Sequence, residues 1–209
     1  MTARLSTHRV GAHALLVEVA DATAALSLAS WARAEAVEVD EVVPGAETVL
    51  FDGVRDPVAL VRLLERWLPG TSPAEGRLVE VPVVYDGADL EFVAAAWGVT
   101  PDEVVTRHAE LEFVAAFCGF APGFSYLAGL PQDLAVPRLD SPRSRVPAGS
   151  VAVGGPWCGV YPTTSPGGWR ILGRTDVVLW DPRRPDPALL PPGTRVRFRD
   201  ASTGGLPST

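Results

Sequence analysis

Lysine is absent from this 209-residue chain, so all 18 of its cationic side chains are arginines. The absence excludes several kinds of chemistry on the chain itself. A Walker A phosphate loop needs its lysine on the phosphates, and Schiff-base or covalent biotin chemistry needs a lysine amine. A compositional bias toward arginine and selection for arginine chemistry both explain this pattern, and the exclusions hold in either case.

Cysteines and long apolar runs are also scarce. Cys118 and Cys158 are far apart and form no C-x-x-C motif, so we expect two buried thiols and neither a zinc site nor a disulfide framework. The N-terminus lacks the apolar region of a signal peptide, and no run is long enough for a membrane span, which makes a cytoplasmic location the expectation. The net charge of −7 argues against nucleic acid or an anionic membrane as a partner.

Residues 1–76 are predicted to form a small α/β domain. The hydrophobic patterns indicate a strand at 12–20, an alanine-rich helix at 21–36, strands at 37–43 and 48–53, and a helix that begins at Pro57. With one further strand to close it, this order suits a two-layer α/β sandwich. Residues 69–76 have the composition of a linker, so the predicted domain boundary follows residue 76.

Residues 77–209 are predicted to form a second, mainly β domain. A strand-like segment at 78–87 precedes a helix at 89–97, and the capping box Thr100-Pro101-Asp102-Glu103 opens a helix that reaches about Leu111. From Glu112 onward, short apolar pieces alternate with glycine and proline turns, which is typical of an antiparallel barrel or sandwich. The predicted fold class is therefore α+β.

The segment 119–175 is the strongest candidate for a site, because it is dense in glycine, proline, aromatic residues and arginine. In its first part, Phe120, Phe124 and Tyr126 alternate with backbone-setting residues. They form either a pocket wall or the aromatic core of a barrel corner. A nucleophilic serine at Ser125 is not expected, because Leu127 stands where a G-x-S-x-G motif needs its second glycine.

Arginines supply the second feature of this segment. Arg138, Arg143 and Arg145 stand among three prolines, which favours preorganised recognition of a carboxylate or phosphate, although a solvated loop has the same composition. The pattern Ser165 to Trp169 predicts a type II turn, with glycine at the position of positive φ. In the strand that follows, alternation places Arg170 and Arg174 on one face, where they converge on one ligand or form a salt-bridged barrel face.

His108 is the only histidine outside the N-terminal region. Helical spacing groups it with apolar residues, which favours a satisfied core histidine. Its helix also leads directly into the glycine-rich segment, where an imidazole could act as acid, base or hydrogen-bond donor. Motifs for NAD, metal or phosphoryl transfer are absent from the sequence, so composition and spacing predict a small-molecule pocket without naming its ligand.

Several blocks in order resemble the family that contains the 5-oxoprolinase B subunit (PxpB or KipI) and allophanate hydrolase subunit 1. The matching blocks are His108, GFAPGFSYL (119–127), PRLDSPRSRVPAGSV (137–151), GVYPTTSPGGW (159–169) and LGRT (172–175). The resemblance covers essentially the whole chain. It implies an N-terminal α/β domain followed by a cyclophilin-like antiparallel β barrel.

The same resemblance implies a function. Family members work with a PxpC/KipA-type subunit and a PxpA-type subunit in the ATP-dependent cleavage of 5-oxoproline to glutamate. On this basis ATP is the expected cofactor, which a partner chain could bind, with no metal or covalent cofactor on this chain. The expected catalytic residues are His108, Arg145 and Ser150. The expected substrate-binding residues are Phe120, Phe124, Tyr126, Arg138, Arg143, Tyr161, Ser165, Trp169 and Arg174.

Two other functions share these blocks and stay open. KipI-type members inhibit a histidine kinase, and a related two-subunit module forms the carboxyltransferase half of urea carboxylase-like systems, with biotin on another chain. The chain departs from the family at Trp157-Cys158, where Gln-Thr is usual, and at Phe113, where Tyr is usual. These apolar or thiol side chains replace hydrogen-bonding ones, so the substrate is expected to be a lactam or urea-like molecule without being fixed further.

Overall fold

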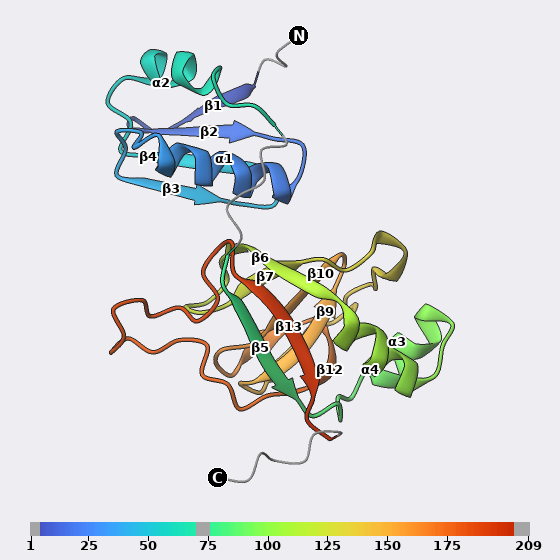
Figure 1. Ribbon diagram of the computed structural model, residues 1–209. Coiled ribbons are helices and arrows are strands. Elements are labelled where there is room, and N and C mark those ends of the chain that lie inside the picture. The colour runs from blue at the N-terminus through green and yellow to red at the C-terminus, as the bar shows by residue number, and fades with distance from the viewer. Residues whose placement is uncertain (1–4, 70–75, 203–209) are drawn as a thin grey trace. The chain divides into compact units, whose positions relative to one another are not determined.

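The computed structural model describes residues 5–69 and 76–202, and most of the linker-like segment, residues 70–75, lies outside this part. The chain divides into two compact units, Met1–Gly76 and Arg77–Thr209 (Figure 1). Each unit has its own hydrophobic core. Among the described residues, no helix is long and apolar enough to cross a membrane.

The N-terminal unit is a four-stranded antiparallel sheet with two helices. Its elements are β1 (Ser6–Val10), β2 (Ala14–Glu18), α1 (Ala22–Ala34), β3 (Glu41–Pro44), β4 (Thr48–Asp52) and α2 (Pro57–Leu64). The strand order is β1-β2-β4-β3. Both helices pack on one face of the sheet, where Val17, Val49 and Phe51 are fully buried against residues of α1 and α2.

The predicted order of this unit needs two corrections. The additional strand of the sheet is β1, at the start of the unit, and it forms a hairpin with β2 through Gly11 at φ 62°, a conformation that favours glycine. The strand expected at 37–43 begins only at Glu41. The four residues before it lie outside the sheet and follow the end of α1.

The second unit is a seven-stranded, barrel-like sheet with two helices. Its elements are β5 (Leu78–Val83), α3 (Leu90–Trp97), α4 (Pro101–Glu110), β6 (Glu112–Cys118), β7 (Ser125–Ala128), η1 (Gln132–Leu134), β8 (Arg143–Val146), β9 (Ser150–Gly154), β10 (Trp157–Val160), β11 (Ser165–Gly167), β12 (Arg170–Arg174) and β13 (Arg195–Asp200). The sheet order is β12-β9-β10-β7-β6-β13-β5, and β11 pairs separately with β8. A bridge between Val84 and Arg174 joins the two edges of the sheet.

The predicted α+β class and barrel are confirmed, but the sheet is not antiparallel throughout. Strand β13, the last one in the described part of the chain, lies between β5 and β6 (Figure 1) and runs parallel to β5. A parallel pair needs a long connection, and here the whole of the barrel unit connects β5 to β13. The sequence contains no local signal for such a distant pairing.

Helix α4 begins where the capping box predicts. The Thr100 Oγ1 accepts from the Glu103 backbone N at 3.3 Å, and the Glu103 carboxylate accepts from the Thr100 N at 2.8 Å. These hydrogen bonds satisfy two of the unpaired N–H groups at the helix start. The Glu103 carboxylate also accepts from the Thr100 hydroxyl, and the two bonds that it accepts from Thr100 lower the pKa of Glu103. The helix then carries His108 into the barrel interior, where the residue is fully buried.

The segment around Ser165 differs from its prediction. Gly167 does not have the positive φ that a type II turn requires, and Ser165–Gly167 forms β11 opposite β8. In β12 the register shifts between Ile171 and Gly173, so the strict alternation predicted for this strand does not hold. The thiols also differ, because Cys158 is buried while Cys118 is exposed.

Candidate functional site

An aromatic cluster lies on the outer face of the barrel wall. Its buried members are Phe124, Val146, Ala152, Tyr161 and Trp169. Strand β9 separates it from the barrel interior, because Ala152 packs in this cluster while its neighbours Val151 and Val153 pack in the interior core. Since successive side chains of a strand point to opposite faces, the aromatic cluster and the barrel core form two distinct layers.

A small pocket opens over this cluster. It has a volume of about 110 Å³ and is lined by Phe120, Phe124, Tyr126, Arg138, Tyr161, Gly167, Gly168 and Trp169. Six of these eight residues were predicted from the sequence as substrate-binding. Ligand sites for drug-sized molecules typically span about 300–1,000 Å³, so this pocket suits a molecule of amino-acid size or one end of a larger ligand.

Arg138 provides the positive charge of the pocket. Its guanidinium carbon lies 5.7 Å from the centroid of the Trp169 ring, in the range of a cation–π contact. In the described parts of the chain, no carboxylate lies within ion-pair distance of Arg138. The exposed Arg138 side chain is therefore preoriented by an aromatic face and available for an anion.

Two other lining residues carry features that packing alone does not require. Phe120 has φ 69°, which is strained for a bulky residue, and it is 59% exposed beside Phe124 and Tyr161. Burial raises the pKa of the Tyr161 phenol, with a hydrogen bond to the Trp169 backbone acting in the opposite direction. The Tyr161 hydroxyl is thus a protonated donor at neutral pH.

Arg143 does not line the pocket, because it is engaged by Asp89. Its Nη2 donates to both carboxylate oxygens of Asp89 at 2.9 Å, and its Nη1 donates to the Trp169 carbonyl at 3.3 Å. The backbone N of Ile171 donates to the same carboxylate at 2.7 Å, and Arg170 Nη1 lies 3.6 Å from it. Arg143 therefore contacts the wall of the pocket through Trp169 without being one of its lining residues.

The structure distributes the remaining predicted residues away from the pocket. Arg145 is exposed on β8, and Ser150 is buried at the start of β9. Arg174 pairs with Asp86 at 2.9 Å and Arg170 lies beside Asp89, so the two arginines have separate carboxylate partners, as in the alternative of a salt-bridged barrel face. The Ser165 hydroxyl is buried with no hydrogen-bond partner in the described residues, on a strand position opposite Val146 of the aromatic cluster.

His108 lies in the barrel core. Its Nδ1 is 2.8 Å from the Tyr85 hydroxyl, its Nε2 is 3.3 Å from the Cys158 Sγ, and its ring stacks on Phe198. Burial lowers the pKa of His108 to about 3, so the imidazole is neutral. Since the core and the pocket occupy opposite faces of the barrel wall, the structure does not bring His108 to the pocket. These contacts agree with the interpretation of His108 as a core histidine whose ring nitrogens have polar neighbours.

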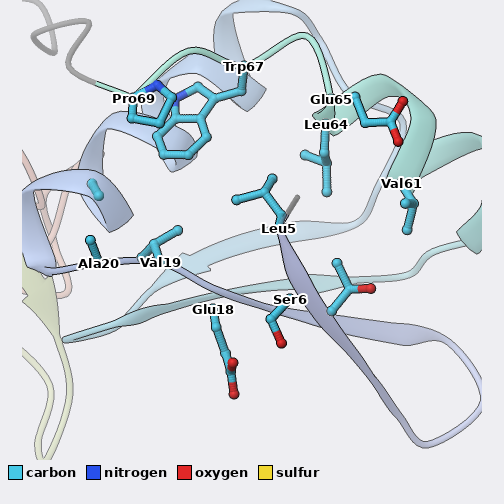
Figure 2. A pocket seen from close by; sticks show the side chains of 12 residues that line it. Leu5, Ser6, Glu18, Val19, Ala20, Val61, Leu64, Glu65, Trp67 and Pro69 are labelled. Atoms are coloured by element: carbon cyan, nitrogen blue, oxygen red, sulfur yellow. The ribbon is translucent and has the colours of Figure 1, made fainter. Parts of the chain in front are cut away.

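A larger cavity, of about 410 Å³, lies in the N-terminal unit. Figure 2 shows Leu5, Val19, Leu64 and Trp67 turned toward its centre, while the carboxylate of Glu18 points away. Its lining contains no residue predicted as part of the site and no arginine, so it lacks a cation for a carboxylate or phosphate. We therefore place the candidate site in the smaller pocket, where charge and aromatic faces meet.

Comparison with known proteins defines the class. Residues 5–190 match the model of the carboxyltransferase domain, subdomain C and D, and the chain belongs to this family. It is 43% identical over 169 residues to the 5-oxoprolinase B subunit of Escherichia coli O157:H7, covering 77% of each chain. It is 40% identical over 168 residues to the 5-oxoprolinase B subunit of Haemophilus influenzae, covering 77% of this chain and 79% of that one. These matches confirm the resemblance to the 5-oxoprolinase B subunit family that the sequence blocks indicated.

Solved structures extend this result. The crystal structure of TTHA0988 has a TM-score of 0.76 and 36% identity, and the match covers 94% of this chain and 41% of that chain. The Kluyveromyces lactis urea amidolyase has a TM-score of 0.71 at 16% identity, with 94% of this chain and 15% of that chain covered, and shows the fold alone. This chain therefore spans less than half the length of both proteins.

Sequence reasoning missed Asp89 and the role of Arg170. The sequence patterns place Asp89 only at the start of a predicted helix, and they group Arg170 with Arg174. The sequence carried one signal: an aspartate directly before a helix is a preferred N-cap residue, whose carboxylate is expected to accept hydrogen bonds. The partners of that carboxylate could not be identified, because Arg143 is 54 residues away in the sequence.

Proposed function

We propose that this chain is one subunit of an ATP-dependent 5-oxoprolinase, in which the pocket over Trp169 binds the carboxylate end of 5-oxoproline. The observation that carries the proposal is the Arg138 guanidinium, which lies on an aromatic wall with no carboxylate partner among the described residues. A planar guanidinium binds a carboxylate through two parallel hydrogen bonds, and the aromatic rings offer a flat apolar surface to the five-membered ring.

The remainder of the active site would come from partner chains. The pocket is small, and the chain has no lysine for a phosphate loop. ATP would supply the phosphoryl group that turns the stable lactam into a better electrophile, and we assign its binding to a PxpC/KipA-type or PxpA-type subunit. This chain would bind and orient the substrate, and it would be inactive alone.

The test is reconstitution. The chain is purified with PxpC/KipA-type and PxpA-type subunits, and glutamate release from 5-oxoproline is measured with and without ATP. Release that needs all chains and ATP supports the proposal. A complex that forms but turns over neither 5-oxoproline nor related lactams overturns it.

Carboxyl transfer to a urea-like substrate is the second candidate, favoured by the description of the matching family as a carboxyltransferase domain. It requires a biotin carrier on another chain. Bicarbonate-dependent turnover with a biotinylated partner, in place of lactam cleavage, would identify it. The histidine-kinase inhibitor hypothesis stays a prediction.

A further inference from the structure

The carboxylate of Asp89 does not cap the helix that follows it in the sequence. Asp89 occupies the N-cap position of α3, yet its side chain makes no hydrogen bond to that helix. The side chain is only 7% exposed and turns toward β8 and β12. Because aspartate at this position normally caps the helix, a buried Asp89 carboxylate that bonds to other elements indicates a role elsewhere in the fold.

Arg170 is the second member of this network. Its guanidinium carbon lies 3.6 Å from the centroid of the Phe92 ring, and its Nη1 lies 3.6 Å from Asp89 Oδ1. Its Nε donates to the carbonyl oxygen of Pro137 at 3.1 Å. With its side chain 14% exposed, Arg170 is held by a ring, a carboxylate and a backbone oxygen at once.

These contacts extend to two walls of the pocket, the charged one at Arg138 and the aromatic one at Trp169. On one side of Arg138, the Pro137 carbonyl accepts from Arg170, and on the other, the Leu139 backbone N donates to the Gly168 carbonyl at 2.7 Å. Trp169 is fixed through its own carbonyl, which accepts from Arg143, and Arg143 is bound to Asp89. The backbone on the Pro137 side of Arg138 and the backbone of Trp169 therefore depend on one buried carboxylate and its two arginines.

We propose that Asp89 and Arg170 are positioning residues for this pocket, which hold the Arg138 guanidinium over the Trp169 ring in the geometry that accepts an anion. Neither residue lines the pocket. Both act through Arg138 and Trp169. The identity of the anion as 5-oxoproline rests on the proposed function, whereas the positioning role does not.

The first test is a double-mutant cycle in the reconstituted complex, with KM for 5-oxoproline and kcat as readouts. Arg170→Met is expected to raise KM roughly tenfold, the effect of losing one hydrogen bond to a charged group, with kcat little changed. In an Arg138→Met background, Arg170→Met adds nothing, because the group through which it acts is gone. Additive effects of the two changes would overturn the positioning role.

The second test needs no substrate. In the full chain labelled with ¹⁵N, the indole N–H resonance of Trp169 is assigned by its loss in Trp169→Phe. Asp89→Asn and Arg170→Met are expected to shift or broaden it. Arg197→Met is the matched control, since it removes an arginine that pairs with Glu112 at 2.8 Å on a strand not adjacent to β12. An unchanged indole resonance in both network variants contradicts the proposal.

A substitute variant and the substrate-free readout keep the outcomes apart. If Asp89→Asn does not fold, Arg170→Lys replaces it, because it keeps the charge while removing the planar group that stacks on Phe92 and the Nε–H that binds Pro137. If the wild-type complex does not cleave 5-oxoproline, the proposed function fails, and the indole resonances still decide the positioning role.

Discussion

Gly154 lies directly under the indole of Trp169: a Cβ placed on Gly154 would be 2.6 Å from the Trp169 Cδ1 and 2.9 Å from its Nε1. The neighbouring strand repeats this arrangement, because a Cβ on Gly159 would lie 3.1 Å from both the Phe124 and Trp169 rings. Glycines on β9 and β10 thus let aromatic rings lie flat on the barrel wall. The pocket exists because these strand positions carry no side chains.

Replacing Gly154 should therefore displace the Trp169 ring. Gly154→Ala forces an overpacked contact, and we expect it to lower the free energy of unfolding by about 1–3 kcal/mol and to shift the Trp169 fluorescence. Gly119→Ala is the control, since its Cβ would meet only the Tyr126 ring at 3.7 Å, an ordinary contact. Equal stability of the two variants in denaturant titrations would contradict this account.

The arginines of the segment should separate by their effect on stability. Arg143→Met leaves the Asp89 carboxylate, which is 7% exposed, without its bidentate partner, and we expect a loss of about 3 kcal/mol. Arg138→Met removes an exposed side chain with no ion pair among the described residues, so its effect should stay within about 0.5 kcal/mol. Chemical denaturation of both variants checks the contrast, and a similar cost for both would refute it.

Arg138 and Arg145 should differ in their effect on activity. In the reconstituted complex, Arg138→Gln is expected to raise KM for 5-oxoproline by roughly ten- to a hundredfold, because a charged hydrogen bond to the substrate is lost. Arg145→Gln should have a smaller effect on KM, since Arg145 does not line the pocket. A collapse of kcat in Arg145→Gln alone would instead support the catalytic role predicted for Arg145 from the sequence.

His108 should make stability depend on pH. Its pKa of about 3 in the folded chain lies below the ordinary value of 6.5, so the unfolded chain binds the proton more tightly. The stabilisation is complete above about pH 6.5 and is lost as the pH falls toward 3, at about 1.4 kcal/mol per pH unit. The difference in unfolding free energy between wild type and His108→Gln should therefore shrink from pH 7 to pH 4. A constant difference would exclude this linkage.

The capping box of α4 offers a test of the local structure. Thr100→Ala removes the side-chain acceptor for the Glu103 backbone N and should cost about 1 kcal/mol. Thr106→Ala in the same helix is the control. Its hydroxyl only bonds back to the Asp102 carbonyl, and alanine has the higher helix propensity, so stability should be unchanged or higher. Thermal unfolding of both variants distinguishes the two cases.

Local patterns predicted the parts of the fold that depend on neighbours in the sequence. The capping box at Thr100 fixed the start of α4, and Pro57 begins α2 as its position indicated. Predictions failed where the outcome depends on distant segments. The pairing of β5 with β13 joins the two ends of the barrel unit, and β11 pairs with β8 in place of a turn. The local turn propensity of Ser165 to Gly167 does not depend on which strand lies beside the segment, so it could not predict the pairing with β8.

The sequence by itself determined which chemical groups are available: arginine as the only permanent cation, and aromatic rings spaced by glycine and proline between residues 119 and 175. The tertiary structure alone decided which of these groups line the pocket. Asp89, far from the segment in sequence, binds Arg143 and lies beside Arg170, Asp86 binds Arg174, and Arg138 is left facing the pocket. The physical reason is that a charge becomes available to a ligand only when no partner in the fold lies within ion-pair distance, and spacing along the chain does not determine that distance.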